Sequence, residues 1–328
     1  MTASTSAQTA RVRPFHVSVP NSEIDDLKQR LAKTRWPDPE TVPDWSQGVG
    51  LENAKALVEH WERDYDWRRT DSTRLGRHAH RLGLAWAELM RRLGYERWAA
   101  HGGDWGAAVT TALGAMRPHG LLGIHLNTPY AFPAEIPSAL SSEEQDAVDG
   151  LALYGGPLGG SNHLQGTKPE TVGFALADSP AGQAAWIYEK FQSKTDNRGL
   201  AEDAICIEDI LDTISLYWFS NSAASSARIY WENRSATMAG PKLVLPVAVT
   251  VFPRDIPRLP KTWIEDAYSD LIHYGEAEAG GHFAALEQPE TLVSEIRSGL
   301  RGIRPQIYPR AVASATPRQP VSPRARLQ

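Results

Sequence analysis

Apolar residues recur at helical spacing in the first part of the chain. Ile24, Leu27 and Leu31 fall on one face of a predicted helix, and a second amphipathic helix is predicted at 51–65. Before them, apolar and polar residues alternate over 15–19, which favours a short strand. This part of the chain carries no catalytic motif, and we interpret it as a helical meander.

From Gly83 onward, the pattern changes to helices that alternate with short buried strands. Continuous apolar runs predict four strands, at 97–101, 121–127, 243–252 and 271–275. Between the second and third of these strands, residues 135–240 are predicted to be mostly helical. Strand–helix alternation on both sides of a helical block is typical of a parallel α/β sheet that carries an inserted helical cap.

Composition excludes several classes of protein. The 328 residues hold 34 Lys and Arg against 39 Asp and Glu, a net charge of −5, which argues against a nucleic-acid binder. A single cysteine, Cys206, excludes a disulfide framework and a Cys-rich zinc site. No run approaches the roughly 20 apolar residues of a membrane span, and the N-terminus has no apolar signal region. We therefore expect a cytoplasmic protein with neither a membrane nor a nucleic-acid partner.

Both ends of the chain are predicted to be disordered tails. Residues 1–13 are rich in Ser, Thr and Ala, and residues 301–328 are basic and rich in proline. Neither segment has enough apolar residues to form a packed element.

The sharpest chemical motif is GGDWG at 102–106, between a predicted strand and a predicted helix. This is the context of a nucleophile elbow, in which flanking glycines permit a strained turn that holds the central side chain out. The nucleophile would be Asp104, kept ionised by the helix dipole and by free backbone N–H groups. An ionised aspartate can attack an electrophilic carbon and form an ester. The alternative is a plain glycine-rich turn in which Asp104 only caps the helix.

Two further motifs supply partners for this nucleophile. His282, in a GGHF loop after the last predicted strand, could activate water against an ester on Asp104. Asp255, just after the 243–252 strand, could orient the imidazole through its N–H group. Each motif is weak alone, but the order Asp, Asp, His, each in a loop after a strand, is that of an α/β-hydrolase.

Other sites of chemistry are not indicated. The GGDWG run lacks the spacing of a dinucleotide fingerprint, and the sequence contains no phosphate-binding loop of the Walker type. The histidines lack the HExxH spacing of a metal site. We expect neither a cofactor nor a metal.

The sequence resembles the microsomal-type epoxide hydrolase family over nearly all of residues 14–300. The runs that carry the resemblance are RPFHVSVP, RLAKTRWPD, AWAELMRRLGYERWAAHGGDWGAAV, LQGTKPETVGFALADSPAGQAAWIYEKF, SLYWFSNSAASSARIYWEN, FPRDI and GGHFAALEQPETL. The implied fold is an α/β-hydrolase with a reduced parallel sheet. Its parts would be an N-terminal region at 14–70, a hydrolase core at 83–134 and 241–300, and a helical cap at 135–240.

The resemblance also implies a mechanism. Asp104 would open an apolar epoxide by attack on carbon, and cap tyrosines would hydrogen-bond the epoxide oxygen. In SSARIYWEN the matching tyrosine is Tyr230, with Tyr217 as a nearby rival. His282, oriented by Asp255, would activate water to hydrolyse the ester and release a vicinal diol. The backbone N–H of Trp105 would serve the oxyanion.

One departure from the family concerns the second cap tyrosine. The family places it just before the QGTKP-like run, in a Gly-Tyr step, whereas this chain has Gly160-Ser161 there. Tyr154, seven residues earlier, does not align with it. One of the two hydrogen-bond donors is therefore expected to be missing, and activity to be weakened.

A second departure is the absence of a block of sequence. Residues 71–80 join the N-terminal region directly to the helix before the nucleophile, with no loop of the HGWPG type that supplies an oxyanion donor. The lost strands correspond to roughly 80 residues, judged from the size of a βαβ unit. The 97–101 strand would become an open, apolar edge, where a homodimer could form.

Two alternatives to an active epoxide hydrolase stay open. A catalytically inactive remnant would bind an apolar ligand or a partner, as the missing donors suggest. A haloalkane dehalogenase would use the same aspartate nucleophile, although Tyr230 favours the epoxide.

Overall fold

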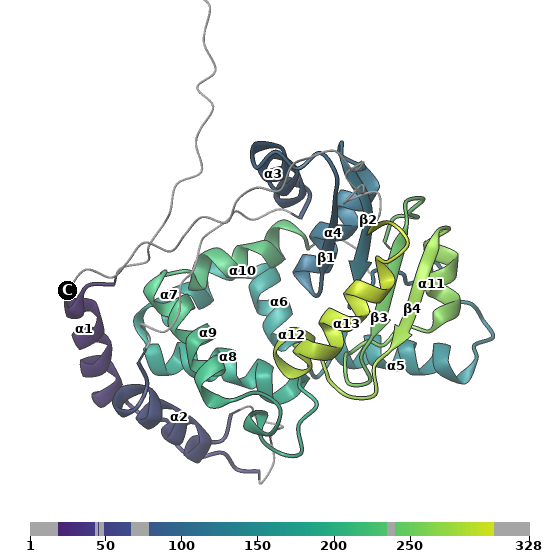
Figure 1. The fold of residues 1–328 in the computed structure, drawn as a ribbon. Helices are drawn as coiled ribbons and strands as arrows, with labels where there is room; N and C mark the ends of the chain where they lie inside the picture. Colours follow the sequence, from purple (N-terminus) through teal and green to yellow (C-terminus); the bar gives the residue numbers. More distant parts are fainter. Residues whose placement is uncertain (1–18, 43–44, 46–48, 67–78, 235–239, 305–328) are drawn as a thin grey trace, which may run out of the picture.

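Four parallel strands form the sheet at the centre of the molecule (Figure 1). They lie in the order β1 (Trp98–Gly102), β2 (Leu121–Leu126), β3 (Val247–Val251) and β4 (Leu271–Glu276). The structure, a computed structural model, describes residues 19–42, 45, 49–66, 79–234 and 240–304. The predicted parallel sheet is confirmed.

The third strand is shorter than predicted. The predicted strand covered 243–252, but β3 begins only at Val247. Pro246 has no N–H group to donate to a neighbouring strand, and before it Leu243 makes only an isolated bridge to Tyr268.

Helices cover both faces of the sheet. Helix α4 (Trp105–Met116) lies close to one face, where a Cβ atom on Gly114 would stand 3.2 Å from the side chain of Ile124. Helix α13 (Pro289–Gly299) lies on the other face, where a Cβ atom on Gly299 would stand 2.7 Å from the Cβ of Ala248. Helix α3 (Ala79–Arg92) packs against α4, and α11 (Lys261–Ala267) packs beside β4. The outcome is the layered α/β core that the alternating pattern predicted.

Between β2 and β3 the chain leaves the sheet and forms a block of helices, as predicted. Its members are α5 (Ser142–Gly155), α6 (Gly160–Thr167), α7 (Pro169–Asp178), α8 (Pro180–Lys194), the 3-10 turn η3 (Ala201–Asp203), α9 (Ile207–Phe219) and α10 (Ala223–Glu232). Serine caps begin two of these helices. Ser141 forms a capping box with Glu144, and the Ser179 hydroxyl accepts the Gly182 N–H.

The N-terminal helices pack on this cap and not on the sheet. Helix α1 (Asn21–Ala32) and helix α2 (Leu51–Arg63) share one buried cluster with α8 and α9. In that cluster the Trp61 indole N–H donates to the Ser215 hydroxyl at 2.9 Å. The meander therefore supports the outer side of the cap (Figure 1).

Strand β1 lies at the edge of the sheet and pairs only with β2 among the described residues. Trp98 and Gly102 are buried, and the strand between them is partly exposed. An apolar cavity of about 530 Å³ borders this strand between α3 and α4, lined by Trp86 and Met90 among others. The expected edge position is confirmed for this part of the chain, and a homodimer across it stays a prediction.

Several predicted features lie outside the described residues. They are the tail at 1–13, the strand expected around 15–18, the junction at 71–78 and most of the tail at 301–328. No helix in the described part of the chain is long and apolar enough to cross a membrane.

Candidate active site

Asp104 sits in the sharp turn between β1 and α4. Its φ of 47° and ψ of −126° are rare for a residue with a side chain. The turn is so tight that a Cβ on Gly102 would stand 2.1 Å from the carbonyl oxygen of Gly106. A Cβ on Gly106 itself would meet open space, so of these two glycines only Gly102 is sterically required. The predicted strand–turn–helix context is present, with Asp104 at the N-terminus of α4.

His282 lies between two aspartates. Its Nδ1 atom is 2.8 Å from Asp255 Oδ1, and its Nε2 atom is 3.5 Å from Asp104 Oδ2. The three residues follow β1, β3 and β4, because the carboxyl ends of parallel strands meet at one edge of the sheet. The structure thus brings together the three residues that the motifs predicted.

A threonine that sequence reasoning missed holds Asp255. The Thr128 hydroxyl, just after β2, donates to Asp255 Oδ2 at 2.9 Å, and the Ile256 N–H donates to Oδ1 at 3.0 Å. Asp255 acts as an acceptor in both bonds, so we assign the proton of the third bond to His282 Nδ1. That tautomer leaves Nε2 facing Asp104.

The electrostatics of the site favour an ion pair. Burial disfavours the Asp104 carboxylate, but the His282 hydrogen bond, the charges of His282 and Lys194 and the Trp105 N–H outweigh it and lower the Asp104 pKa. Burial likewise disfavours protonated His282. Hydrogen bonds to Asp104 and Asp255, and then their charges, overcome that effect and raise the His282 pKa to about 9. The resting site therefore holds an anionic Asp104 beside a cationic His282 at neutral pH.

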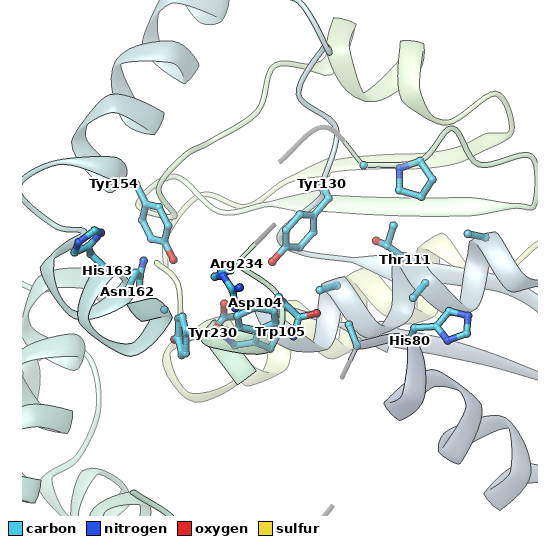
Figure 2. A pocket seen from close by; sticks show the side chains of 18 of the residues that line it. His80, Asp104, Trp105, Thr111, Tyr130, Tyr154, Asn162, His163, Tyr230 and Arg234 are labelled. Carbon is cyan, nitrogen blue, oxygen red and sulfur yellow. The ribbon is translucent and has the colours of Figure 1, made fainter. Parts of the chain in front are cut away.

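A cavity of about 1090 Å³ opens above Asp104 (Figure 2). The Asp104 side chain keeps 46% of its surface accessible because it faces this space. One wall is the small-residue face of α4, and three tyrosines, Tyr130, Tyr154 and Tyr230, supply hydroxyl groups to the lining. The space is large enough for a drug-sized apolar molecule.

Tyr230, the predicted cap tyrosine, projects from α10 into this cavity. Its ring meets the Trp105 ring edge to face, with centroids 5.1 Å apart. The Trp105 indole N–H lies beside the phenol and opposes the rise that burial causes in the Tyr230 pKa, although it makes no well-aligned hydrogen bond among the described residues. The rival Tyr217 packs against the cluster shared by α2, α8 and α9.

Tyr154 lines the same cavity although it does not align with the family's second tyrosine. It lies in the last turn of α5, whereas Ser161 is buried in the first turn of α6. The α5–α6 loop folds back sharply, since a Cβ on Gly159 would stand 2.5 Å from the Tyr154 carbonyl oxygen. No sequence signal announced this position, because it depends on that turn.

Lys194 is a second residue that the sequence did not indicate. Its ammonium group lies 4.9 Å from the centre of the Tyr154 ring, and its carbonyl oxygen accepts the His282 N–H at 2.9 Å. Burial lowers the Lys194 pKa, while the charges of Asp104 and Asp255 act in the opposite direction. Lys194 therefore brings positive charge close to the nucleophile.

The described residues offer one backbone donor to an oxyanion on Asp104, the N–H of Trp105. They contain no group of three or more His, Cys, Asp or Glu residues that could hold a metal ion. The groups gathered around the cavity and Asp104 are a carboxylate, an imidazole and phenols.

Comparisons with known proteins point in the same direction as the geometry. The family model "Epoxide hydrolase N terminus" matches residues 12–80. A Stigmatella aurantiaca protein named "Putative epoxide hydrolase" is 44% identical over 376 aligned positions, which cover 89% of this chain and 86% of the relative. Epoxide hydrolase 1 of Sus scrofa is 26% identical over 89% of both chains.

The first of these alignments also bears on the missing block. Because 89% of 328 residues is about 292, at least about 84 of the 376 aligned positions face no residue of this chain. That number agrees with the roughly 80 residues expected from the size of a βαβ unit.

The fold is similar to those of solved epoxide hydrolases. The Aspergillus niger enzyme matches with a TM-score of 0.78 at 21% identity, over 90% of this chain and 97% of that chain. Juvenile hormone epoxide hydrolase from the silkworm Bombyx mori matches with the same TM-score at 20% identity, over 90% of this chain and 95% of that chain. The predicted α/β-hydrolase fold is confirmed, and with a relative 44% identical over most of both proteins, the chain belongs to the epoxide hydrolase family.

Proposed function

We propose that the chain converts a small apolar epoxide to a vicinal diol through an ester on Asp104. In the first step an Asp104 carboxylate oxygen attacks an epoxide carbon, and the carbon–oxygen bond of the ring breaks. The Tyr230 phenol gives its proton to the departing oxygen, which becomes the first hydroxyl of the product. The cavity above Asp104 would hold the substrate, and its small-residue wall suits an apolar one.

The second step hydrolyses the ester. Ester formation removes the negative charge of Asp104, so the His282 pKa falls. The imidazolium returns a proton to the phenolate left at Tyr230, and its Nε2 atom becomes a base. His282 takes a proton from water, and the hydroxide attacks the carbonyl carbon of the ester. The Trp105 N–H stabilises the oxyanion, and collapse of the intermediate releases the diol and restores the carboxylate.

The observation that carries this proposal is the position of His282 between its two aspartates. Nδ1 is fixed by Asp255, and Nε2 faces the carboxylate that would carry the ester. A histidine with only a structural role would not need both contacts at the base of a large cavity. Tyr230 on the same cavity favours an epoxide over a haloalkane, because a phenol can protonate the departing oxygen.

The test is diol formation from an aryl epoxide by the wild-type protein and by the Asp104→Ala variant. We expect turnover by the wild type and none by the variant. In His282→Gln we expect the ester to accumulate, visible by intact mass as an addition equal to the mass of the epoxide. A cooperatively folding wild type that forms neither diol nor ester would support the inactive remnant. Halide release from a haloalkane without diol formation would support the dehalogenase.

A further inference from the structure

We propose that Tyr154 is the second proton donor to the epoxide oxygen, in place of the tyrosine that this chain lacks at Ser161, and that Asn162 and Lys194 position it. This inference rests on the proposed function, because it concerns the ring-opening step of that reaction. Tyr154 would be a catalytic residue, whereas Asn162 and Lys194 would be positioning residues that act through Tyr154.

The first argument is where the hydroxyl groups point. In Figure 2 the hydroxyl of Tyr154 is directed into the cavity that Asp104 faces, while Tyr230 stands on the same wall closer to Asp104. Tyr154 comes from α5 and Tyr230 from α10, so the two phenols approach from separate elements of the cap. An oxygen that leaves a carbon under attack by Asp104 would therefore have two phenols within the same space.

The second argument is how each phenol is supported. A phenol that donates to substrate needs a neighbour that donates to its own oxygen, because that neighbour leaves the phenolic proton free and stabilises the developing phenolate. The Trp105 ring meets the Tyr230 ring edge to face, and its indole N–H opposes the rise in the Tyr230 pKa without a well-aligned hydrogen bond. The Asn162 side chain lies near the Tyr154 hydroxyl in Figure 2, and it acts against the rise in the Tyr154 pKa to about 12 that burial causes.

The third argument is the charge behind Tyr154. The Lys194 ammonium lies 4.9 Å from the ring centre and, among the described residues, makes no hydrogen bond or ion pair. A cation on the ring favours the phenolate that proton transfer leaves behind, and it holds the ring in one orientation. Lys194 is therefore placed to position Tyr154 and to stabilise its charged form.

Tyr130 is the rival donor, since its hydroxyl also faces the cavity (Figure 2). Burial and the charges of Asp104 and Asp255 raise the Tyr130 pKa, and no hydrogen bond from a described residue counts among the causes that shift it. Proton transfer from Tyr130 would leave an unsupported phenolate, which makes it the poorer acid. Tyr154, with the Lys194 ammonium against its ring, is therefore favoured over Tyr130.

The proposed step balances without another reactant. An Asp104 oxygen forms a bond to carbon, the ring carbon–oxygen bond breaks, and the oxygen takes one proton from a phenol. Once the ester has formed, the cationic His282 gives up its Nε2 proton, which restores the phenol. The neutral imidazole then takes a proton from water while the hydroxide attacks the ester, and the hydrogen of that hydroxide ends on the released oxygen of the diol. The sum is epoxide and water to diol.

The experiment measures ring opening separately from ester hydrolysis. In the His282→Gln background, the build-up of the ester on styrene oxide is followed by rapid quench and intact mass. We expect Tyr154→Phe to slow this build-up about 10²-fold, the scale of one lost oxyanion donor, and the double variant with Tyr230→Phe to slow it further. With His282 intact, Tyr154→Phe should leave the rate of decay of preformed ester unchanged. A merely structural role of Tyr154 would not slow ester formation while sparing ester hydrolysis.

Controls keep the outcome clear. Tyr95→Phe, at a side chain that is 55% exposed, should leave the ring-opening rate unchanged. Asn162→Leu retains Tyr154 but removes its supporting amide, and it should slow ring opening even if Tyr154→Phe proves unstable.

Either of two results would overturn the inference while leaving the proposed function in place: ring opening unaffected by both Tyr154→Phe and Asn162→Leu, or a loss confined to Tyr130→Phe. A wild type that forms no ester would instead overturn the proposed function.

Discussion

At the scale of single residues, the protonation state of His282 depends on both aspartates of the triad. His282 contacts both Asp104 and Asp255, and its pKa rises because the two carboxylates outweigh the cost of burial. The same imidazole must be a cation while Asp104 waits for substrate and a base once the ester has formed. Loss of the Asp104 charge on ester formation is the event that can change one form into the other.

This coupling is open to direct measurement. Asp104→Asn removes one charge of the pair and imitates the uncharged ester, so the His282 pKa should fall below its wild-type value of about 9, by about one unit or more. Titration of the histidine ring protons by NMR would measure the shift, with His282→Gln assigning the resonance. An unchanged titration in Asp104→Asn would mean that Asp255 alone sets the pKa.

At the residue scale, the motifs predicted the triad but not its support. Asp104, Asp255 and His282 each stand in a short local pattern that follows a strand, which is why sequence alone could find them. Thr128 and Tyr154 stand in no such pattern. They reach the site through the path of β2 and the turn after α5, which only the folded cap and core define.

At the scale of the element, the elbow is the most constrained part of the chain. The backbone of Gly102 approaches Gly106 so closely that no Cβ atom on Gly102 would fit between them. This close packing holds Asp104, which lies between the two glycines, at its unusual φ. The strained conformation at Asp104 thus depends on one glycine more than on the other.

A matched pair of substitutions tests this asymmetry. Gly102→Ala should destabilise the protein by about 3 kcal/mol or more, or prevent folding, because its Cβ would overlap a backbone carbonyl. Gly106→Ala meets open space in the first turn of α4 and should be neutral or stabilising by up to about 1 kcal/mol. Urea unfolding of the two variants measures both effects. Equal losses would show that the elbow does not depend on this contact.

Element boundaries were predictable where capping chemistry or periodicity was strong. Ser179 followed by Pro180 is a typical start of a helix, and Ser179 caps α8 in the structure. Ser22, although a residue type that often caps helices, does not cap α1, because α1 begins at Asn21 with Pro20 at the cap and Ser22 lies inside the first turn. The extent of β3 was overestimated because an apolar run does not show where neighbouring strands provide partners.

At the scale of the whole molecule, a chain of polar side chains crosses the sheet from β1 to α13, and it is fully buried at His125 and Thr250. His101 contacts His125 at 3.0 Å, His125 contacts the Thr250 hydroxyl at 3.1 Å, and that hydroxyl donates to Glu295 on α13. Because the Thr250 hydroxyl donates its proton to Glu295, it accepts from His125, which donates from Nε2. His125 then accepts at Nδ1 from the His101 ring. This chain of hydrogen bonds therefore requires a neutral His125.

Stability should consequently depend on pH in both directions. Burial, followed by the charges of His101 and His273, lowers the His125 pKa to about 3, below its unfolded value of 6.5. The unfolded chain binds more protons between these values, so this group's contribution to stability falls as the pH drops from 6.5 towards 3. His282 acts in the opposite sense, because its raised pKa makes its contribution fall as the pH rises from 6.5 to about 9.

Unfolding free energies measured across pH 4 to 9.5 should therefore peak near neutrality. His125→Gln keeps a donor and an acceptor but cannot titrate, so it should flatten the acid side of the profile and leave the alkaline side unchanged. A variant whose acid side keeps the wild-type slope would assign that slope to other groups, such as the carboxylates.

The long separation of Asp104 and His282 along the chain has a consequence for the timing of assembly. The nucleophile and its helix are synthesised before the cap, and the histidine follows only after β4. A molecule in which the His282 loop has opened while Asp104 stays in its elbow can still be alkylated, but it cannot release the product. The ester on such a molecule would persist until the loop returns His282 to Asp104.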